Sequence, residues 1–144
     1  MSTQQRNDLC TIAVDPEVAA AVRSQTLVVL EANHYYFEEI LEFGPEAQHA
    51  LSVIYRDAFA VLDAVGWDPA TTPPPGGGFT VPLTGGHVEQ LQRRRHELGH
   101  ANIDRLEHAG TRADIDRDRA TAQALDRLFG AWAKATRSRS DGPR

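Results

Sequence analysis

Apolar residues recur every three or four positions over residues 16–44, the spacing that predicts one face of a helix. Two such stripes are present, displaced from each other by about a third to a half of a turn at about 100° per residue. A helix with one solvent-exposed face needs only one apolar stripe, so we expect this helix to be covered from two directions. The first stripe comprises Val18, Val22, Gln25, Val29, Ala32, Tyr36, Ile40 and Phe43, and the second Leu27, Leu30, His34, Phe37 and Leu41.

The ends of this helix and the start of the next one are marked by typical capping residues. Asp15 followed by Pro16 supplies an N-cap and a first-turn proline, and Gly44 is a residue able to end the helix with a positive φ. Residues 46–66 then repeat the helical spacing of apolar residues. Because the turn at Gly44 and Pro45 is so short, the two helices are expected to form an antiparallel hairpin.

Residues 67–84, WDPATTPPPGGGFTVPLT, interrupt the helical pattern. Three consecutive prolines and three glycines cannot continue a helix, so the sequence predicts a loop of about eighteen residues. Loops of this length are uncommon in a compact domain and are often lids, crossovers or linkers. Phe79, Val81 and Leu83 alternate with polar residues or proline, and we expect them to lie back across the helices.

Two further helices are expected over residues 86–108 and 112–136, joined by a turn around Gly110. The predicted fold is therefore all-α, a four-helix up-down bundle built from two helical hairpins joined by the Pro/Gly-rich loop. Residues 1–15 are expected to form a flexible N-terminal arm, residues 16–136 the helical domain, and residues 137–144 a disordered tail. The two hairpins could pair within one chain or be exchanged between two chains.

The bulk composition narrows the functional class. A chain of 144 residues suits one domain with a core of its own, and Cys10, the single cysteine, provides no disulfide framework. The sequence has no apolar run typical of an export signal or a membrane span, so we expect a cytoplasmic protein without a membrane partner. A net charge of −5 argues against a general nucleic-acid binder, because phosphate contacts require clustered positive charge.

The string RRRHELGH, residues 93–100, contains the sequence HExxH. His96 and His100 lie one helical turn apart and can share a metal ion, with Glu97 placed to take a proton from a bound water. The motif resembles that of zinc peptidases. The three preceding arginines differ from the apolar residues expected before a desolvated site, and the sequence offers Asp104, Glu107 or His108 as a third ligand.

A second reading of the same string is ExxH, which occurs as Glu97 with His100 and again as Glu31 with His34. This arrangement is similar to the paired motifs of ferritin-like di-iron bundles. Asp57 and either Asp118 or Asp126 would supply further carboxylates. The helical phase argues against this site, because Glu97 and His100 lie about 120° or more from the apolar centre of their helix.

A third reading is based on Arg95, His96 and His100, which together resemble the ribonuclease motif of HEPN-domain toxins and antiviral nucleases. The resemblance implies a helical fold in which His100 acts as an acid/base and Arg95 steadies the phosphate. His96 stands where that family usually has asparagine. The simplest alternative to all three readings is a solvated helix face in which Glu97 offsets the neighbouring positive charge.

We predict from these observations a self-associating binding or adaptor protein without catalysis or a cofactor of its own. The second apolar stripe carries the prediction, because an exposed apolar stripe of that length is usually an interface. A homodimer is expected, with the interface formed by Leu27, Leu30, His34, Phe37 and Leu41. A small-molecule pocket under the 67–84 loop, lined by Trp67, Phe79 and Leu83, is a further alternative, as are the ribonuclease using Arg95 and His100 and the metal site using His96, Glu97 and His100.

Overall fold

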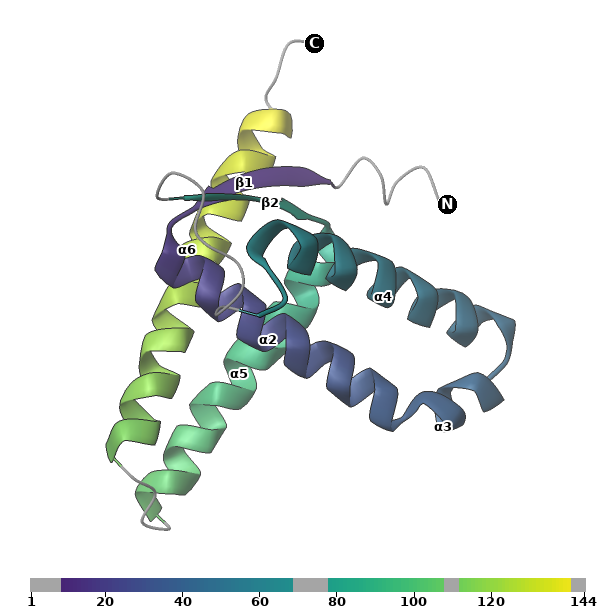
Figure 1. Ribbon diagram of the computed structural model, residues 1–144, viewed down its shortest axis with the longest axis horizontal. Helices are drawn as coiled ribbons and strands as arrows, with labels where there is room; N and C mark the ends of the chain where they lie inside the picture. Colours follow the sequence, from purple (N-terminus) through teal and green to yellow (C-terminus); the bar gives the residue numbers. More distant parts are fainter. Residues whose placement is uncertain (1–8, 69–77, 108–111, 141–144) are drawn as a thin grey trace.

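The computed structural model describes residues 9–68, 78–107 and 112–140 (Figure 1). It is mostly helical, which confirms the predicted class, and it adds a small two-stranded sheet. The elements in chain order are β1 (Cys10–Val14), α2 (Pro16–Tyr35), α3 (Phe37–Glu42), α4 (Pro45–Val65), β2 (Phe79–Leu83), α5 (Gly85–Glu107) and α6 (Arg112–Ser140).

The start of α2 follows the capping signals in the sequence. The Asp15 carboxylate accepts a hydrogen bond from the backbone N–H of Val18 at 2.9 Å, and Pro16 occupies the first turn. The predicted helix over 16–44 is interrupted at Tyr36, so that α2 is followed by the short helix α3. Gly44, with φ of 100°, then connects α3 to α4.

The hairpin of α2 and α4 is present as predicted, and a buried arginine secures its base. Arg23 of α2 donates one hydrogen bond from Nε to the Gly66 carbonyl at 3.1 Å and one from a terminal nitrogen to the Val65 carbonyl at 2.5 Å. These carbonyls lie at the end of α4, where the helix leaves backbone acceptors without intrahelical partners. The positive charge therefore caps α4 from a neighbouring helix.

The sheet corrects two predictions. Residues 10–14 of the expected flexible arm form β1, and residues 79–83 of the expected loop form β2, paired antiparallel with Ile12 opposite Val81. The alternation noted in the sequence is the cause, because Phe79, Val81 and Leu83 all point into the core. Pro82 is tolerated because a two-stranded sheet leaves each strand one unpaired edge.

One core joins all the main elements except α3. The first half of α2 is covered by α4, α5 and α6, while β2 packs on α4 and β1 on α6. Figure 1 shows the α2/α4 hairpin lying across the α5/α6 hairpin instead of alongside it. The four-helix up-down bundle is therefore not confirmed.

The helix α6 is longer than the sequence pattern predicts. Residues 137–140, assigned to a disordered tail, continue the helix to Ser140. At the other end of α6, the predicted turn around Gly110 lies outside the described residues. In Figure 1 the C-terminal end of α6 extends past the sheet, on the opposite side of the molecule from the C-terminal end of α5.

Candidate functional site

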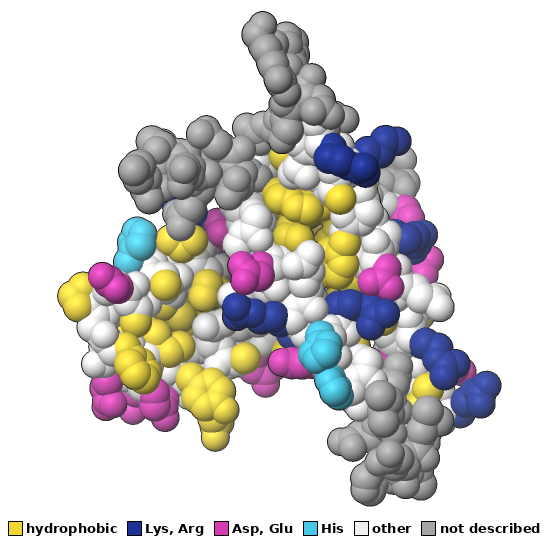
Figure 2. All heavy atoms as spheres, turned by 180° about the vertical axis from the view of Figure 1, so that it is seen from behind, with side chains coloured by type: hydrophobic (Ala, Val, Ile, Leu, Met, Phe, Trp, Pro, Cys, Tyr) yellow, Lys and Arg dark blue, Asp and Glu magenta, His cyan; other side chains and the backbone are white. Residues whose placement is uncertain are grey.

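The outer half of the α2/α4 hairpin, residues 27–59, projects from the core and is called the hairpin tip below. Within it α2 has no buried residue after Val29, and α3 has none. Aromatic side chains are nevertheless concentrated here: Tyr36 is 55% exposed and Phe43 is 81% exposed. Figure 2 shows the tip on the left as a broad hydrophobic area with acidic side chains along its lower edge.

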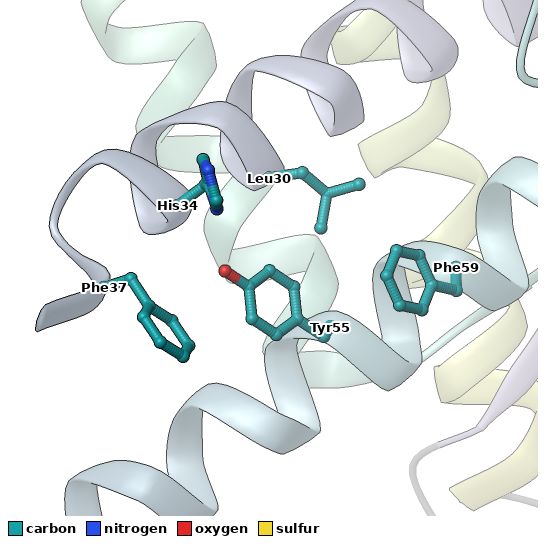
Figure 3. Close-up of a pocket in the computed structure, with 5 residues that line it drawn as sticks. All are labelled: Leu30, His34, Phe37, Tyr55 and Phe59. Atoms are coloured by element: carbon teal, nitrogen blue, oxygen red, sulfur yellow. The ribbon is translucent and has the colours of Figure 1, made fainter. Parts of the chain in front are cut away.

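A pocket of about 410 Å³ opens on this surface, lined by Leu30, His34, Phe37, Tyr55 and Phe59. Figure 3 shows Tyr55 and Phe59 rising from α4 towards Leu30 and His34 of α2, with Phe37 at the start of α3. The spacing of four residues places Tyr55 and Phe59 on one face of α4, where their rings stack with centroids 5.9 Å apart. The His34 ring and the Tyr55 hydroxyl are the polar groups in this lining.

Three of the five residues predicted as an interface line this pocket. Leu30, His34 and Phe37 line it, whereas Leu27 and Leu41 lie on the tip outside the lining. None of the five is buried, and Leu27 and Phe37 are 36% and 38% exposed. Tyr55 and Phe59, the two lining residues of α4, were not among the predicted interface residues.

The apolar residues of the two stripes differ in burial along α2 and α3. In the first half of α2, the buried side chains of Val18, Ala19 and Val22 face several neighbouring elements of the same chain. After Val29 and in α3, the members of both stripes are exposed or half-buried, including Ala32, Tyr36 and Phe43 of the first stripe. The surplus apolar surface is therefore confined to the tip.

A ligand pocket was expected under the 67–84 loop, lined by Trp67, Phe79 and Leu83, but residues 69–77 of that loop lie outside the described residues. Phe79 and Leu83 are core residues, 6% and 0% exposed. Trp67 is exposed and packs on Phe59 with ring centroids 5.4 Å apart, while its indole N–H donates to the Asp63 carboxylate at 2.9 Å. Trp67 thus extends the aromatic surface of the tip towards the base of the hairpin.

The predicted metal residues are only partly brought together. The Nε2 atoms of His96 and His100 lie 3.0 Å apart on the exposed face of α5, as one helical turn allows. Glu97 instead pairs with Arg94, which also donates to the Gln25 side chain at 3.0 Å. Among the residues whose side chains are described, no group of three or more His, Cys, Asp or Glu could hold a metal ion.

The carboxylates considered for a di-iron site are engaged elsewhere. Asp57 accepts a hydrogen bond from the Thr84 hydroxyl at 2.8 Å and pairs with Arg56 at 3.3 Å. Asp126 accepts two hydrogen bonds from Arg95, at 3.1 and 3.2 Å. These contacts stabilise helix packing and leave Asp57 and Asp126 apart from the His96–His100 pair.

The same Arg95–Asp126 contact bears on the ribonuclease reading. A guanidinium that steadies a phosphate must present its N–H donors to solvent, yet Arg95 offers two of them to a carboxylate. His100 lies beside His96 at the helix surface. In the present arrangement, therefore, an RNA phosphate would have to displace Asp126 from Arg95.

A buried polar cluster that the sequence analysis did not find lies where α2, α4 and α5 meet. His87 is 2% exposed, and its Nε2 lies 3.0 Å from the Thr26 hydroxyl. Its Nδ1 is buried and has no hydrogen-bond partner within the described part of the chain. Burial lowers the pKa of His87 to about 4, although the nearby Asp57 carboxylate acts to raise it. The Thr84 hydroxyl links α5 to α4, because it accepts a hydrogen bond from the backbone N–H of His87 at 3.1 Å and donates one to the Asp57 carboxylate at 2.8 Å.

No family model, curated protein or solved structure matches this chain. The described helices include none with the length and apolar character needed to cross a membrane. The hairpin tip is therefore the candidate functional site, because it combines a pocket with exposed aromatic side chains.

Proposed function

We propose that the protein is a non-catalytic binding module that self-associates through the hairpin tip. One observation carries the proposal: the tip holds six of the eight exposed large hydrophobic side chains found among the described residues. They are Leu27, Tyr35, Tyr36, Phe37, Phe43 and Phe59. Such a concentration of exposed apolar side chains on one part of the molecule is typical of an interaction site, whereas ordinary exposure involves single scattered residues.

The shape of the surface favours a protein partner over a small molecule. The pocket volume of about 410 Å³ falls in the range of small-molecule sites, but the same tip carries further exposed aromatic side chains outside the lining, such as Phe43. Interfaces commonly have this form, with an aromatic centre and a polar rim. The glutamates of α3 supply the rim.

In the proposed homodimer, Phe37 and Leu30 lie at the buried centre of the interface. Such a dimer would cover the members of the second stripe that the tip leaves exposed. The protein then acts as an adaptor, since α5 lies outside the interface and remains available to further partners. The contacts of Arg95 and Glu97 with neighbouring side chains favour this reading over catalysis.

Light scattering during size-exclusion chromatography tests the proposal with the variant Phe37→Glu. Because Phe37 is 38% exposed, the charge is expected to leave the fold intact and to weaken association by about tenfold or more. Gln123→Glu, an exposed position on α6, adds the same charge outside the tip and should associate like the wild type. If the wild type is monomeric, or if both variants behave alike, the proposal fails.

A further inference from the structure

The charge of the chain is distributed unevenly, and the hairpin tip carries the excess of negative charge. Residues 27–59 contain six acidic residues and one arginine, so the tip alone accounts for a net charge of −5, equal to that of the whole chain. The remaining residues therefore balance to neutrality. A surface that is both apolar and strongly acidic is complementary to an apolar, basic partner.

Most of the acidic residues on the tip have no cationic partner. Carboxylates elsewhere commonly form ion pairs, as Asp15 and Glu17 do with Arg127 at 3.2 Å and Asp126 does with Arg95. Within the tip, Asp57 pairs with Arg56. The other five acidic side chains of the tip form no ion pair among the described residues: Glu31, Glu38, Glu39, Glu42 and Glu46.

The opposite arrangement occurs at the C-terminal end of α6, residues 129–137. This segment contains Lys134 and Arg137 and no acidic residue. Neither cation has a carboxylate partner among the described residues, although Arg137 donates to the Ala133 carbonyl at 3.4 Å. Phe129 and Trp132 are half-buried on the same segment, so apolar surface accompanies the basic charge.

We propose that the tip of one protomer docks on residues 129–137 of a second copy, and that this contact is made twice in a closed dimer. The inference rests on the proposed self-association and specifies which surfaces meet. Pairing the tips with each other would bring two surfaces of charge −5 together, which costs free energy unless salt screens it. Docking each tip on residues 129–137 instead places unpaired glutamates beside unpaired cations.

A charge-exchange experiment tests this arrangement. The tip variant carries Glu38→Lys, Glu39→Lys and Glu42→Lys, which together change the net charge of the tip from −5 to +1. The α6 variant carries Lys134→Glu and Arg137→Glu, and all five side chains are exposed. Each variant alone is expected to associate at least about tenfold more weakly than the wild type, because like charges then face each other in both contacts. An equimolar mixture should restore dimers, since a heterodimer has opposite charges in both contacts.

The control carries Arg93→Glu and Arg119→Glu, which change the net charge as the α6 variant does but lie outside residues 129–137. It should dimerise like the wild type. Circular dichroism should show unchanged helix content and unfolding midpoint in every variant, because exposed side chains away from caps contribute little to stability.

Salt gives an independent readout of the same contact. Raising sodium chloride from about 20 to 200 mM should weaken the wild-type dimer several-fold if opposite charges meet, and strengthen it if two acidic tips meet. A wild-type dimer that persists in the α6 variant and tightens with salt overturns tip docking on α6 while leaving self-association through the tip intact. A monomeric wild type overturns both, and a mass that grows beyond two copies overturns the closed arrangement.

Discussion

The hydroxyl of Thr26 and the Nε2 atom of His87 lie 3.0 Å apart in the core and join α2 to the first turn of α5. Both side chains are almost completely buried. A polar contact in this position fixes the hairpins relative to each other more specifically than apolar packing alone, because it forms only in one geometry. It also makes the fold sensitive to pH through His87.

The pH dependence of stability follows from the pKa of about 4 at His87, compared with 6.5 for an ordinary histidine. Between these values the unfolded chain binds a proton that the folded chain does not, so stability falls as pH decreases. His87→Gln removes this titrating group. When the pH is lowered from 7 to 5, the free energy of unfolding of the variant should therefore decrease by about 2 kcal/mol less than that of the wild type.

Urea unfolding at the two pH values measures this difference. His49→Gln, on the exposed surface of α4, serves as the matched control and should lose as much stability as the wild type. Equal losses in the wild type and in His87→Gln would show that His87 does not couple folding to protonation.

Arg23 is expected to be essential at the base of the α2/α4 hairpin. Lysine retains the charge but cannot reach both the Val65 and Gly66 carbonyls with a planar group, so Arg23→Lys should lower the free energy of unfolding by about 2 kcal/mol. Chemical denaturation checks this value. Arg119→Lys, at an exposed position, should be neutral, and an equally neutral Arg23→Lys would contradict the capping role.

Core and tip leucines should respond differently to truncation. Leu125 of α6 is fully buried, so Leu125→Ala should cost about 3 kcal/mol by leaving a cavity. Leu27 is 36% exposed and its truncation should cost less than about 1 kcal/mol in the monomer. Unfolding is best measured at a concentration low enough to avoid association. Similar losses at the two sites would mean that the tip is as well packed as the core.

The histidines of α5 provide a test of the metal and ribonuclease alternatives. Since Glu97 is paired with Arg94 and Arg95 with Asp126, protein prepared without a histidine tag should carry well under one zinc ion per chain. Its thermal unfolding should not change with a chelator, and RNA incubated with it should remain intact. Stoichiometric zinc lost in His96→Ala, or cleavage lost in His100→Ala, would establish the corresponding alternative.

The helices could be predicted because their signals are local. Asp15, Pro16 and Gly44 act within a turn of their own positions, and the apolar spacing of α4 is continuous. The sheet depends on pairing Ile12 with Val81, two positions far apart in sequence, so neither five-residue strand is marked by its neighbours alone. The crossing of the two hairpins likewise depends on contacts between distant segments.

The sequence predicted only the side of the pocket that α2 and α3 form. Leu30, His34 and Phe37 follow the second stripe of α2 and α3, whereas Tyr55 joins them from the facing helix and has no signal in its own pattern. His87 was missed because, beside two glycines at the start of a helix, it resembles an ordinary polar residue. Only the arrangement of α2, α4 and α5 shows that its side chain is enclosed.

The most direct test of self-association through the hairpin tip is sedimentation equilibrium of the wild-type protein over about 1 to 100 μM, compared with Phe37→Glu. The account predicts that the wild-type mass rises from the protomer value of 15.8 kDa to twice that value, while Phe37→Glu remains near 15.8 kDa over most of the range. A wild-type mass that stays at 15.8 kDa throughout would contradict it.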